Sequence, residues 1–259
     1  MDQPVRIIFF DIDGTLVDHA TGQISHNTRQ TLHRLQKNGI LLCVATGRAP
    51  CSLPDFGDLH FDMFATFNGA LCYSETETIL SDPLPAPSVQ RVIENAAALG
   101  RPVSIATKDR LVANGVEKDL ADYYALAGLT LAKDEDFDTA CQEDVYQILV
   151  GCREADHPAL IQGATGVKLA VSWDRAVDVI SANGGKGHAV KQILEHFRIA
   201  SSQALAFGDS CNDLDMLQAV GTGIAMGNAN AQLKAIADEV CSSVSEDGIY
   251  RYCLDRGLI

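Results

Sequence analysis

The residues best suited to chemistry stand near the start of the chain, where Asp11 and Asp13 occur in the run Asp-Ile-Asp-Gly-Thr over residues 11–15. Two carboxylates this close repel each other, so the pair is stable only with a cation between them or with one member protonated. Both states are useful in catalysis. Taken alone, the run also fits an ordinary Asp-Gly turn with solvated acids.

A second acidic cluster lies at 208–213, in the run Gly-Asp-Ser-Cys-Asn-Asp. Asp209 follows an apolar run directly, and Asn212 or Asp213 can simply cap the helix that comes next. Acids at the ends of two strands of one sheet, however, converge on a hard cation with oxygen ligands. Because Mg²⁺ needs only a few carboxylates plus a substrate phosphate, the sequence predicts Mg²⁺ as cofactor.

Two further positions can hold an anion. Lys186 lies in a glycine-rich run at a predicted helix start, where its ammonium and nearby backbone amides can bind phosphate. Thr46 and Gly47 follow a predicted strand, and a hydroxyl with free amides there can hold phosphate oxygens. A solvated lysine and an ordinary strand-to-helix turn are the alternatives. The spacing around Lys186 and in 221–227 misses the Walker and dinucleotide fingerprints, which excludes both nucleotide motifs.

The predicted elements bring these positions together. An apolar strand over 6–10 ends at Asp11, a helix over 25–38 follows, and a second apolar strand covers 40–45. Strand, helix and strand form a βαβ unit, which connects right-handedly and places ligands at the carboxyl ends of its strands. The same alternation of helix and strand returns later in the chain, with a helix predicted at 186–197, a strand at 204–207 and a helix at 212–219.

The chain changes character at 81–87, where three prolines in five residues oppose both helix and central strand and mark a linker. A glycine-rich segment at 181–187 marks the end of the stretch that follows this linker. Between the two breaks, strands are predicted near 103–106, 111–114, 145–151 and 167–172, and helices over 88–99 and 117–127. The expected fold class is therefore α/β, a Rossmann-like parallel-sheet core at 1–82 and 183–259 with a smaller α/β domain inserted at 83–182.

Composition limits the partners. The 259 residues carry a net charge of −14, with 47% apolar and 21% charged residues, as expected for a soluble folded protein. The negative field disfavours nucleic acid and anionic membrane as partners, so a small anionic substrate must be held by local positive charge. The eight cysteines form no Cys-x-x-Cys pair, and no membrane span or signal peptide is evident. We predict reduced thiols and a cytoplasmic location.

Four motifs now stand in a fixed order, at 11–15, 46–48, Lys186 and 208–213. This ordered set resembles that of the haloacid dehalogenase-like (HAD) phosphatase superfamily, in particular its Cof-type members. The run Phe-Asn-Gly-Ala at 67–70 also looks like a stretch typical of that subgroup. In this family an α/β cap domain is inserted between the second and third motifs, and the predicted insertion at 83–182 has a suitable size and position.

The resemblance implies a role for each matching residue. Asp11 is expected to be the nucleophile that forms an aspartyl-phosphate, and Asp13 to protonate the leaving alcohol and then activate water. The expected phosphate-binding residues are Thr46, Gly47, Lys186 and Asn212. The expected Mg²⁺ ligands are Asp11, the backbone carbonyl of Asp13, Asp209 and Asp213, the last being either a ligand or a partner of Lys186.

These roles imply a magnesium-dependent phosphatase acting on small phosphorylated metabolites, phosphate monoesters such as sugar phosphates. A phosphomutase on the same core, and a non-hydrolytic phospho-Asp signalling or binding module, stay open as alternatives. In the family the cap contacts the leaving group, so Lys108, Arg110 and the loop around Asp174 and Arg175 are candidate specificity elements. Solvated surface charges would look the same in the sequence.

Overall fold

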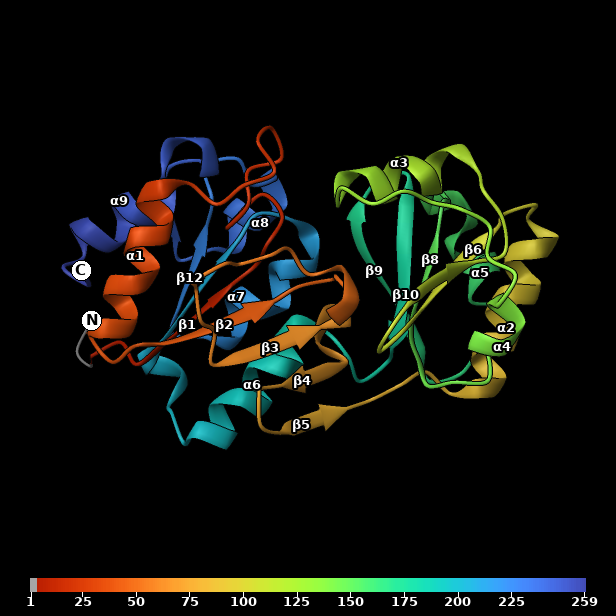
Figure 1. The fold of residues 1–259 in the computed structure, drawn as a ribbon, viewed down its shortest axis with the longest axis horizontal. Coiled ribbons are helices and arrows are strands. Elements are labelled where there is room, and N and C mark those ends of the chain that lie inside the picture. Colours follow the sequence, from red (N-terminus) through yellow and green to blue (C-terminus); the bar gives the residue numbers. More distant parts are fainter. Residues whose placement is uncertain (1–3) are drawn as a thin grey trace. The chain divides into compact units, whose positions relative to one another are not determined.

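A computed structural model describes residues 4–259, and the chain divides into two compact units (Figure 1). The first unit consists of the chain up to Thr46, Pro54–Leu80 and Lys186–Ile259, and the second of Gly47–Leu53 and Ser81–Gly185. Each unit has its own sheet and its own cluster of buried apolar side chains. Each therefore has a core of its own.

The first unit is built on a sheet of eight strands within the described residues. These are β1 Ile7–Phe10, β2 Leu41–Ala45, β3 Met63–Thr66, β4 Leu71–Tyr73, β5 Thr78–Ser81, β11 Ala204–Gly208, β12 Thr222–Ala225 and β13 Glu239–Val240. Their order is β13-β12-β11-β1-β2-β3-β4-β5. Neighbours from β13 to β3 are parallel, and β4 turns back antiparallel to β3. The predicted parallel α/β core is confirmed.

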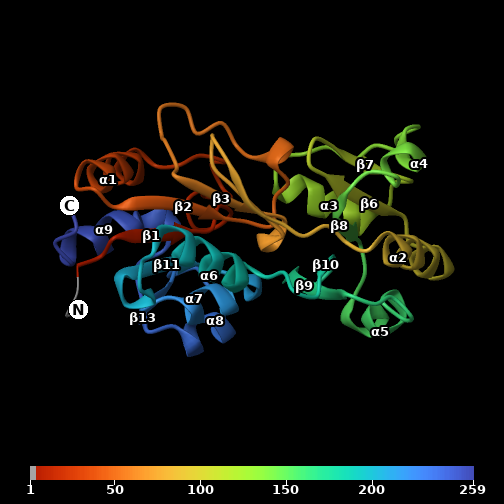
Figure 2. The same cartoon turned by 90° about the horizontal axis from the view of Figure 1, so that it is seen from below.

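Helices cover both faces of this sheet (Figure 2). They are α1 His26–Lys37, α6 Lys186–Phe197, α7 Leu214–Ala219, α8 Ala231–Ile236 and α9 Gly248–Asp255. Ile7 and Phe9 of β1 share a buried cluster with side chains of α6, α7 and α8. On the opposite face, Phe10 stacks on Phe207, and the Phe207 ring meets the edge of Tyr252 from α9. β1 is thus buried on both sides, as its unbroken apolar run predicts.

The second unit contains a five-stranded antiparallel sheet in the order β7-β6-β8-β10-β9. Its elements are β6 Val103–Thr107, β7 Leu111–Ala113, β8 Val145–Val150, β9 Val167–Trp173, β10 Ala176–Ser181, α2 Ala86–Ala98, α3 Lys118–Leu126, α4 Phe137–Ala140 and α5 His157–Leu160. Side chains of α2 and α5 pack into one apolar cluster, and those of α3 form another with β7 and β8.

Two features of the second unit differ from the sequence prediction. The prolines read as a linker at 81–87 partly belong to a helix, because α2 begins at Ala86 with Pro87 in its first turn, where proline is well tolerated. The strand β10 was not predicted, although it lies inside the sheet. Its apolar run is interrupted by Asp178, which is nevertheless buried and accepts hydrogen bonds from the Tyr123 hydroxyl.

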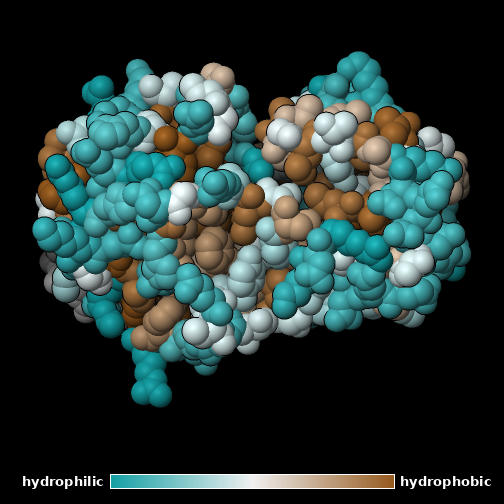
Figure 3. All heavy atoms as spheres, in the orientation of Figure 1, coloured by the Kyte–Doolittle hydropathy of each residue, from teal (hydrophilic) through white to brown (hydrophobic). Residues whose placement is uncertain are grey.

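Hydrophilic residues cover much of the surface shown in Figure 3, and apolar residues are gathered in smaller groups on each unit. Among the described residues, the large apolar side chains that are exposed are Val116, Leu126, Val171, Ile236, Val240 and Leu254. Within residues 4–259, no helix combines the length and the apolar character that crossing a membrane requires.

Candidate active site

Parallel pairing brings the candidate residues to one edge of the first sheet. Phe10, the last residue of β1, is in register with Val44 of β2 and with Phe207 of β11. Asp11, Thr46 and Asp209 follow these strands within one or two residues, so all three lie at the carboxyl edge. The Asp11 amide donates to the Phe207 carbonyl at 3.0 Å, which extends the ladder to the site. The carboxyl edge of the sheet therefore brings together residues that follow three strands, as predicted.

The turn after β1 is packed tightly against Asp209. Gly14 has a φ of +81°, and a Cβ placed there would lie 2.3 Å from Asp209 Oδ2. Only glycine combines this backbone conformation with so close an approach. The Asn228 side-chain amide donates to the Gly14 carbonyl at 2.8 Å and fixes the turn from another segment. Asp13, half-buried in the same turn, is bridged to Val17.

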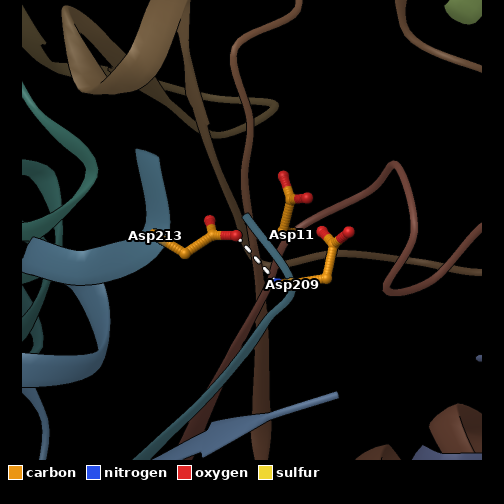
Figure 4. Close-up of side chains that lie close together, drawn as sticks. All are labelled: Asp11, Asp209 and Asp213. Atoms are coloured by element: carbon orange, nitrogen blue, oxygen red, sulfur yellow. Dashed lines mark hydrogen bonds between the residues drawn. The ribbon is translucent and has the colours of Figure 1, made fainter. Parts of the chain in front are cut away.

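Three carboxylates gather at this edge (Figure 4): Asp11, Asp209 and Asp213 each offer an oxygen, and these oxygens lie within 4.8 Å of one another. Asp213 Oδ2 accepts from the backbone amides of Asp209 and Ser210, both at 3.0 Å. In contrast, Asp209 Oδ1 is buried and has no hydrogen-bond partner among the described residues. An ionised carboxylate with a buried oxygen in this condition is strongly unfavourable unless a cation binds it or the group takes up a proton.

Lys186 is the positive charge inside the cluster. Its side chain is fully buried at the start of α6, and Nζ lies 2.6 Å from Asp11 Oδ1 and 2.6 Å from Asp213 Oδ1. One ammonium therefore serves two carboxylates. With Asp209 included, three negative charges face one positive charge, which leaves a formal excess of two negative charges in a buried site.

The raised pKa values of Asp11 and Asp209 are consistent with this excess of negative charge. Burial raises the pKa of Asp11 to about 7; Lys186 opposes the rise, and the carboxylates of Asp213 and Asp13 add to it. Burial, Asp11 and Asp213 raise the pKa of Asp209 to about 9. Burial lowers the pKa of Lys186, but the two carboxylates it contacts outweigh that effect and raise it above its ordinary value. The ammonium stays charged while the acids resist ionising together, a pattern typical of functional sites.

Besides Lys186, the residues predicted to bind phosphate lie in two segments, one before α7 and one after β2. Asn212 lies in the turn before α7, where its Nδ2 donates to Asn68 Oδ1 at 2.9 Å and its Oδ1 accepts from the Ser210 hydroxyl at 2.6 Å. Thr46 is buried just after β2, and its carbonyl accepts from the Asn68 amide at 2.9 Å. Gly47 begins the short segment 47–53 that belongs to the second unit.

Sequence reasoning missed three asparagine and serine residues that hold the site together: Asn68, Ser210 and Asn228. In the sequence, Asn68 stands out only as part of the run Phe-Asn-Gly-Ala at 67–70. The Asn-Gly pair in that run is a turn signal, but the signal says nothing about which distant side chain the turn contacts. Ser210 and Asn228 carry no sequence signal beyond their proximity to acidic or glycine-rich runs.

The candidate specificity residues of the second unit are engaged within that unit. Arg110 pairs with Glu143 and lies 3.7 Å from Asp136. Arg175 pairs with Asp119 and Asp122, and its guanidinium lies 3.9 Å from the centre of the Trp173 ring. Lys108 is exposed. The two arginines therefore have structural partners of their own.

The fold and the buried acid cluster place the chain among Rossmann-like α/β enzymes. The family model of haloacid dehalogenase-like hydrolases matches residues 8–253. Among solved structures, the HAD subclass IIB sugar phosphatase BT4131 is 26% identical and aligns with a TM-score of 0.91 over 98% of this chain and 100% of that one. The chain belongs to the haloacid dehalogenase-like hydrolase family.

Two full-length relatives from Bacillus subtilis (strain 168) narrow the enzyme class. YkrA, provisionally named a phosphatase, is 33% identical over 98% of both chains. YitU, a 5-amino-6-(5-phospho-D-ribitylamino)uracil phosphatase, is 26% identical over 97% of both chains. Together with the family and the site, these relatives identify the chain as a phosphatase.

Proposed function

We propose that this phosphatase is Mg²⁺-dependent and hydrolyses phosphate monoesters of small metabolites through an aspartyl-phosphate on Asp11. The observation that carries the proposal is the buried cluster of Asp11, Asp209 and Asp213, in which a single lysine leaves an excess of negative charge. Such a cluster favours a divalent cation, and a phosphoryl group bound beside that cation would complete the charge balance.

The donor set fits Mg²⁺. Asp209 Oδ1 is a buried oxygen without a hydrogen-bond partner among the described residues, and one carboxylate oxygen of Asp11 lies within 4.8 Å of one of Asp209. We propose these two side chains as ligands, together with the backbone carbonyl of Asp13. When bound, the cation would neutralise charge on the phosphoryl oxygens and on the attacking carboxylate.

The hydrogen bonds favour a different role for Asp213. Its Oδ1 contacts Lys186, and its Oδ2 accepts two backbone amides, so both oxygens are already occupied. Of the two roles predicted for this residue, we therefore prefer the anchor of Lys186 to the direct metal ligand. Such supporting carboxylates orient the groups that touch the substrate.

In the proposed first step, a carboxylate oxygen of Asp11 attacks phosphorus, the bond from phosphorus to the ester oxygen breaks, and Asp13 gives its proton to the departing alkoxide. In the second step, Asp13 takes a proton from a water that attacks phosphorus, and the bond to Asp11 breaks. This releases inorganic phosphate and restores both carboxyl groups.

The phosphoryl oxygens would be held by Lys186, the Asn212 amide, the Thr46 hydroxyl and the Gly47 amide. Lys186 is fixed by two carboxylates and Asn212 by two side chains, so neither needs to become ordered when substrate binds. Donors held in place before the reaction are the main source of charge stabilisation in phosphoryl transfer.

The charge of the chain and the names of its relatives support a proposal for the substrate class. A net charge of −14 disfavours nucleic acid, and a sugar phosphatase and a phosphoribitylamino-uracil phosphatase are among the similar proteins. We propose a small phosphorylated metabolite, whose leaving group is selected by the inserted α/β domain at 83–182 between the core segments 1–82 and 183–259. A cytoplasmic location stays a prediction of the sequence.

The test is a screen of phosphorylated metabolites with and without Mg²⁺, with Asp11→Asn as the control. Release of phosphate that requires both the metal and Asp11 supports the proposal, as does a hydroxylamine-sensitive phosphoenzyme seen by intact-mass measurement. Metal-independent turnover, or a fully active Asp11→Asn variant, contradicts it. Turnover that needs a bisphosphate activator favours the phosphomutase, and a long-lived phosphoprotein without turnover favours the signalling module.

A further inference from the structure

The turn after β3 adopts a backbone conformation that needs an explanation. Phe67 and Asn68 have φ values of 54° and 52°, and both are buried. Two consecutive residues with side chains in the left-handed region are uncommon, and each is less stable there than in an ordinary conformation. Strain of this kind persists only where the surrounding structure enforces it, and it is concentrated at functional sites.

The contacts of Asn68 show what the turn holds. Its backbone amide donates to the Thr46 carbonyl at 2.9 Å, and its side-chain Oδ1 accepts from Asn212 Nδ2 at 2.9 Å. One buried residue therefore ties together the segment after β2 and the turn before α7. These segments carry Thr46 and Asn212, two of the residues proposed to bind the phosphoryl group.

The hydrogen bonds also fix which way the Asn212 amide faces. Ser210 donates its hydroxyl proton to Asn212 Oδ1, so the oxygen end is set, and Asn68 takes one of the two protons on Nδ2. Within residues 4–259 the second Nδ2 proton has no acceptor and can serve as the donor for a ligand. Without Asn68, rotation of the amide about its side-chain bonds would no longer be restricted at the nitrogen end.

We propose that Asn68 is a positioning residue, which uses its strained turn to orient the Asn212 amide toward the phosphoryl group. This rests on the proposed function, specifically on Asn212 as a phosphoryl ligand. Asn68 acts through Asn212, and its own side chain need not touch the substrate. Because the phosphoryl group is common to all substrates, the effect of Asn68 is independent of the leaving group.

The decisive experiment is a double-mutant cycle with Asn68→Gly and Asn212→Ala. Glycine adopts a φ of 52° freely and keeps the backbone amide that binds Thr46, so the substitution removes the side-chain contact with Asn212 without disturbing the turn. We expect Asn68→Gly to lower kcat/KM by about tenfold, as loss of an orienting partner typically does. We expect the same factor for substrates with different leaving groups.

In the Asn212→Ala background, Asn68→Gly is expected to cause no further loss, because the residue it positions is gone. Binding of inorganic phosphate should weaken in parallel in both single variants. Arg198→Gly is a matched control: Arg198 also has a positive φ of 52°, but it is exposed and follows the opposite end of α6 from Lys186. Its activity should be unchanged.

Independent losses that multiply in the double variant would overturn the positioning role, since they would mean that Asn68 acts on stability or on another group. Loss of activity in Asn212→Ala with an unchanged Asn68→Gly would overturn this inference alone and leave the proposed function standing. An unchanged Asn212→Ala would overturn the phosphoryl contact of Asn212 and the positioning role together.

Discussion

The two units bury carboxylates in opposite ways. In the second unit, Asp178 is buried inside the sheet, and the Tyr123 hydroxyl lies 3.2 Å from each of its oxygens. In the first unit, Lys186 pairs with Asp11 and Asp213, while the neighbouring Asp209 Oδ1 lacks a partner within the described part of the chain. A buried carboxyl group that is hydrogen-bonded within its own unit needs no further partner, whereas one whose oxygen lacks a partner is suited to binding a cation from solution.

The same difference separates the cations of the two units. Lys186 is fully buried between two carboxylates, whereas Arg175 is partly exposed and paired at the surface. Exposed pairs contribute little because water and salt screen them. The excess of buried charge in the first unit is therefore the feature most sensitive to substitution, pH and metal.

The largest effect is expected from Lys186→Met, which leaves the buried carboxylates without their cation. Removing one partner of a buried ion pair costs about 3–5 kcal/mol in unfolding free energy. Loss of this proposed phosphoryl ligand should also reduce kcat by about 100-fold or more. Thermal unfolding and steady-state kinetics measure the two effects. A variant of wild-type stability in metal-free buffer at pH 8 would show that the acids do not depend on Lys186.

Gly14→Ala is expected to have the next largest effect. The added methyl would lie 2.3 Å from Asp209 Oδ2 and would require an unfavourable φ of +81°, so both the turn and the proposed metal ligand must move. Gly39→Ala is the control, because Gly39 has a φ of +75° with no atom within 4 Å of the added carbon. Both variants should lose about 1–2 kcal/mol from the backbone, and only Gly14→Ala should also lose Mg²⁺ affinity, measured by calorimetry. Equal affinities would refute the packing argument.

The pH dependence of stability tests the charge excess directly. The pKa values of Asp11 and Asp209 are raised to about 7 and about 9, so the folded protein binds more protons than the unfolded chain above about pH 4. The free energy of unfolding of metal-free protein should therefore fall as the pH rises from 5 to 9. Mg²⁺ should raise the free energy of unfolding most near pH 9, because the cation then compensates the negative charge that bound protons compensate at lower pH.

Melting temperatures at pH 5, 7 and 9, with and without Mg²⁺, provide the measurement. Asp209→Asn is the control, and it should flatten the metal-free profile because it removes one of the two titrating acids. A metal-free melting temperature that rises toward pH 9 would contradict the proposed excess of negative charge.

Part of the site could be predicted because it depends on features of the local sequence, such as where a strand ends and where a helix begins. Strand ends are marked by the change from apolar residues to Asp11 and Asp209, and parallel pairing brings such ends to one edge whatever the strand order. The helix predicted at 186–197 is observed as α6, with Lys186 at its first position. The α/β class of the fold followed from the same alternation of apolar runs and amphipathic helices.

Other parts depend on tertiary contacts that a sequence pattern does not encode. Asn68 holds Asn212 only because a turn with two positive φ values places it there. The strand β10 was missed because Asp178 looks like a surface residue until Tyr123 is known to meet it. In both cases a polar side chain is buried by a distant partner, and local pattern favours the opposite interpretation.

The smallest effect is expected from Asp178→Asn. Compared with Asp209→Asn, it tests whether a hydrogen-bonded carboxyl and one that lacks a partner respond differently to the same substitution. The Asn oxygen can still accept from the Tyr123 hydroxyl, so the unfolding free energy should fall by only about 1 kcal/mol, and Mg²⁺ affinity should not change. The same substitution at Asp209 should abolish most of the Mg²⁺ binding. It should also make metal-free protein more stable at pH 8, because the Asp209 carboxyl, with its pKa raised to about 9, must take up a proton on folding at that pH and an amide need not. If both variants lost metal binding equally, the second unit would share the metal site; if neither did, the acid cluster would be structural.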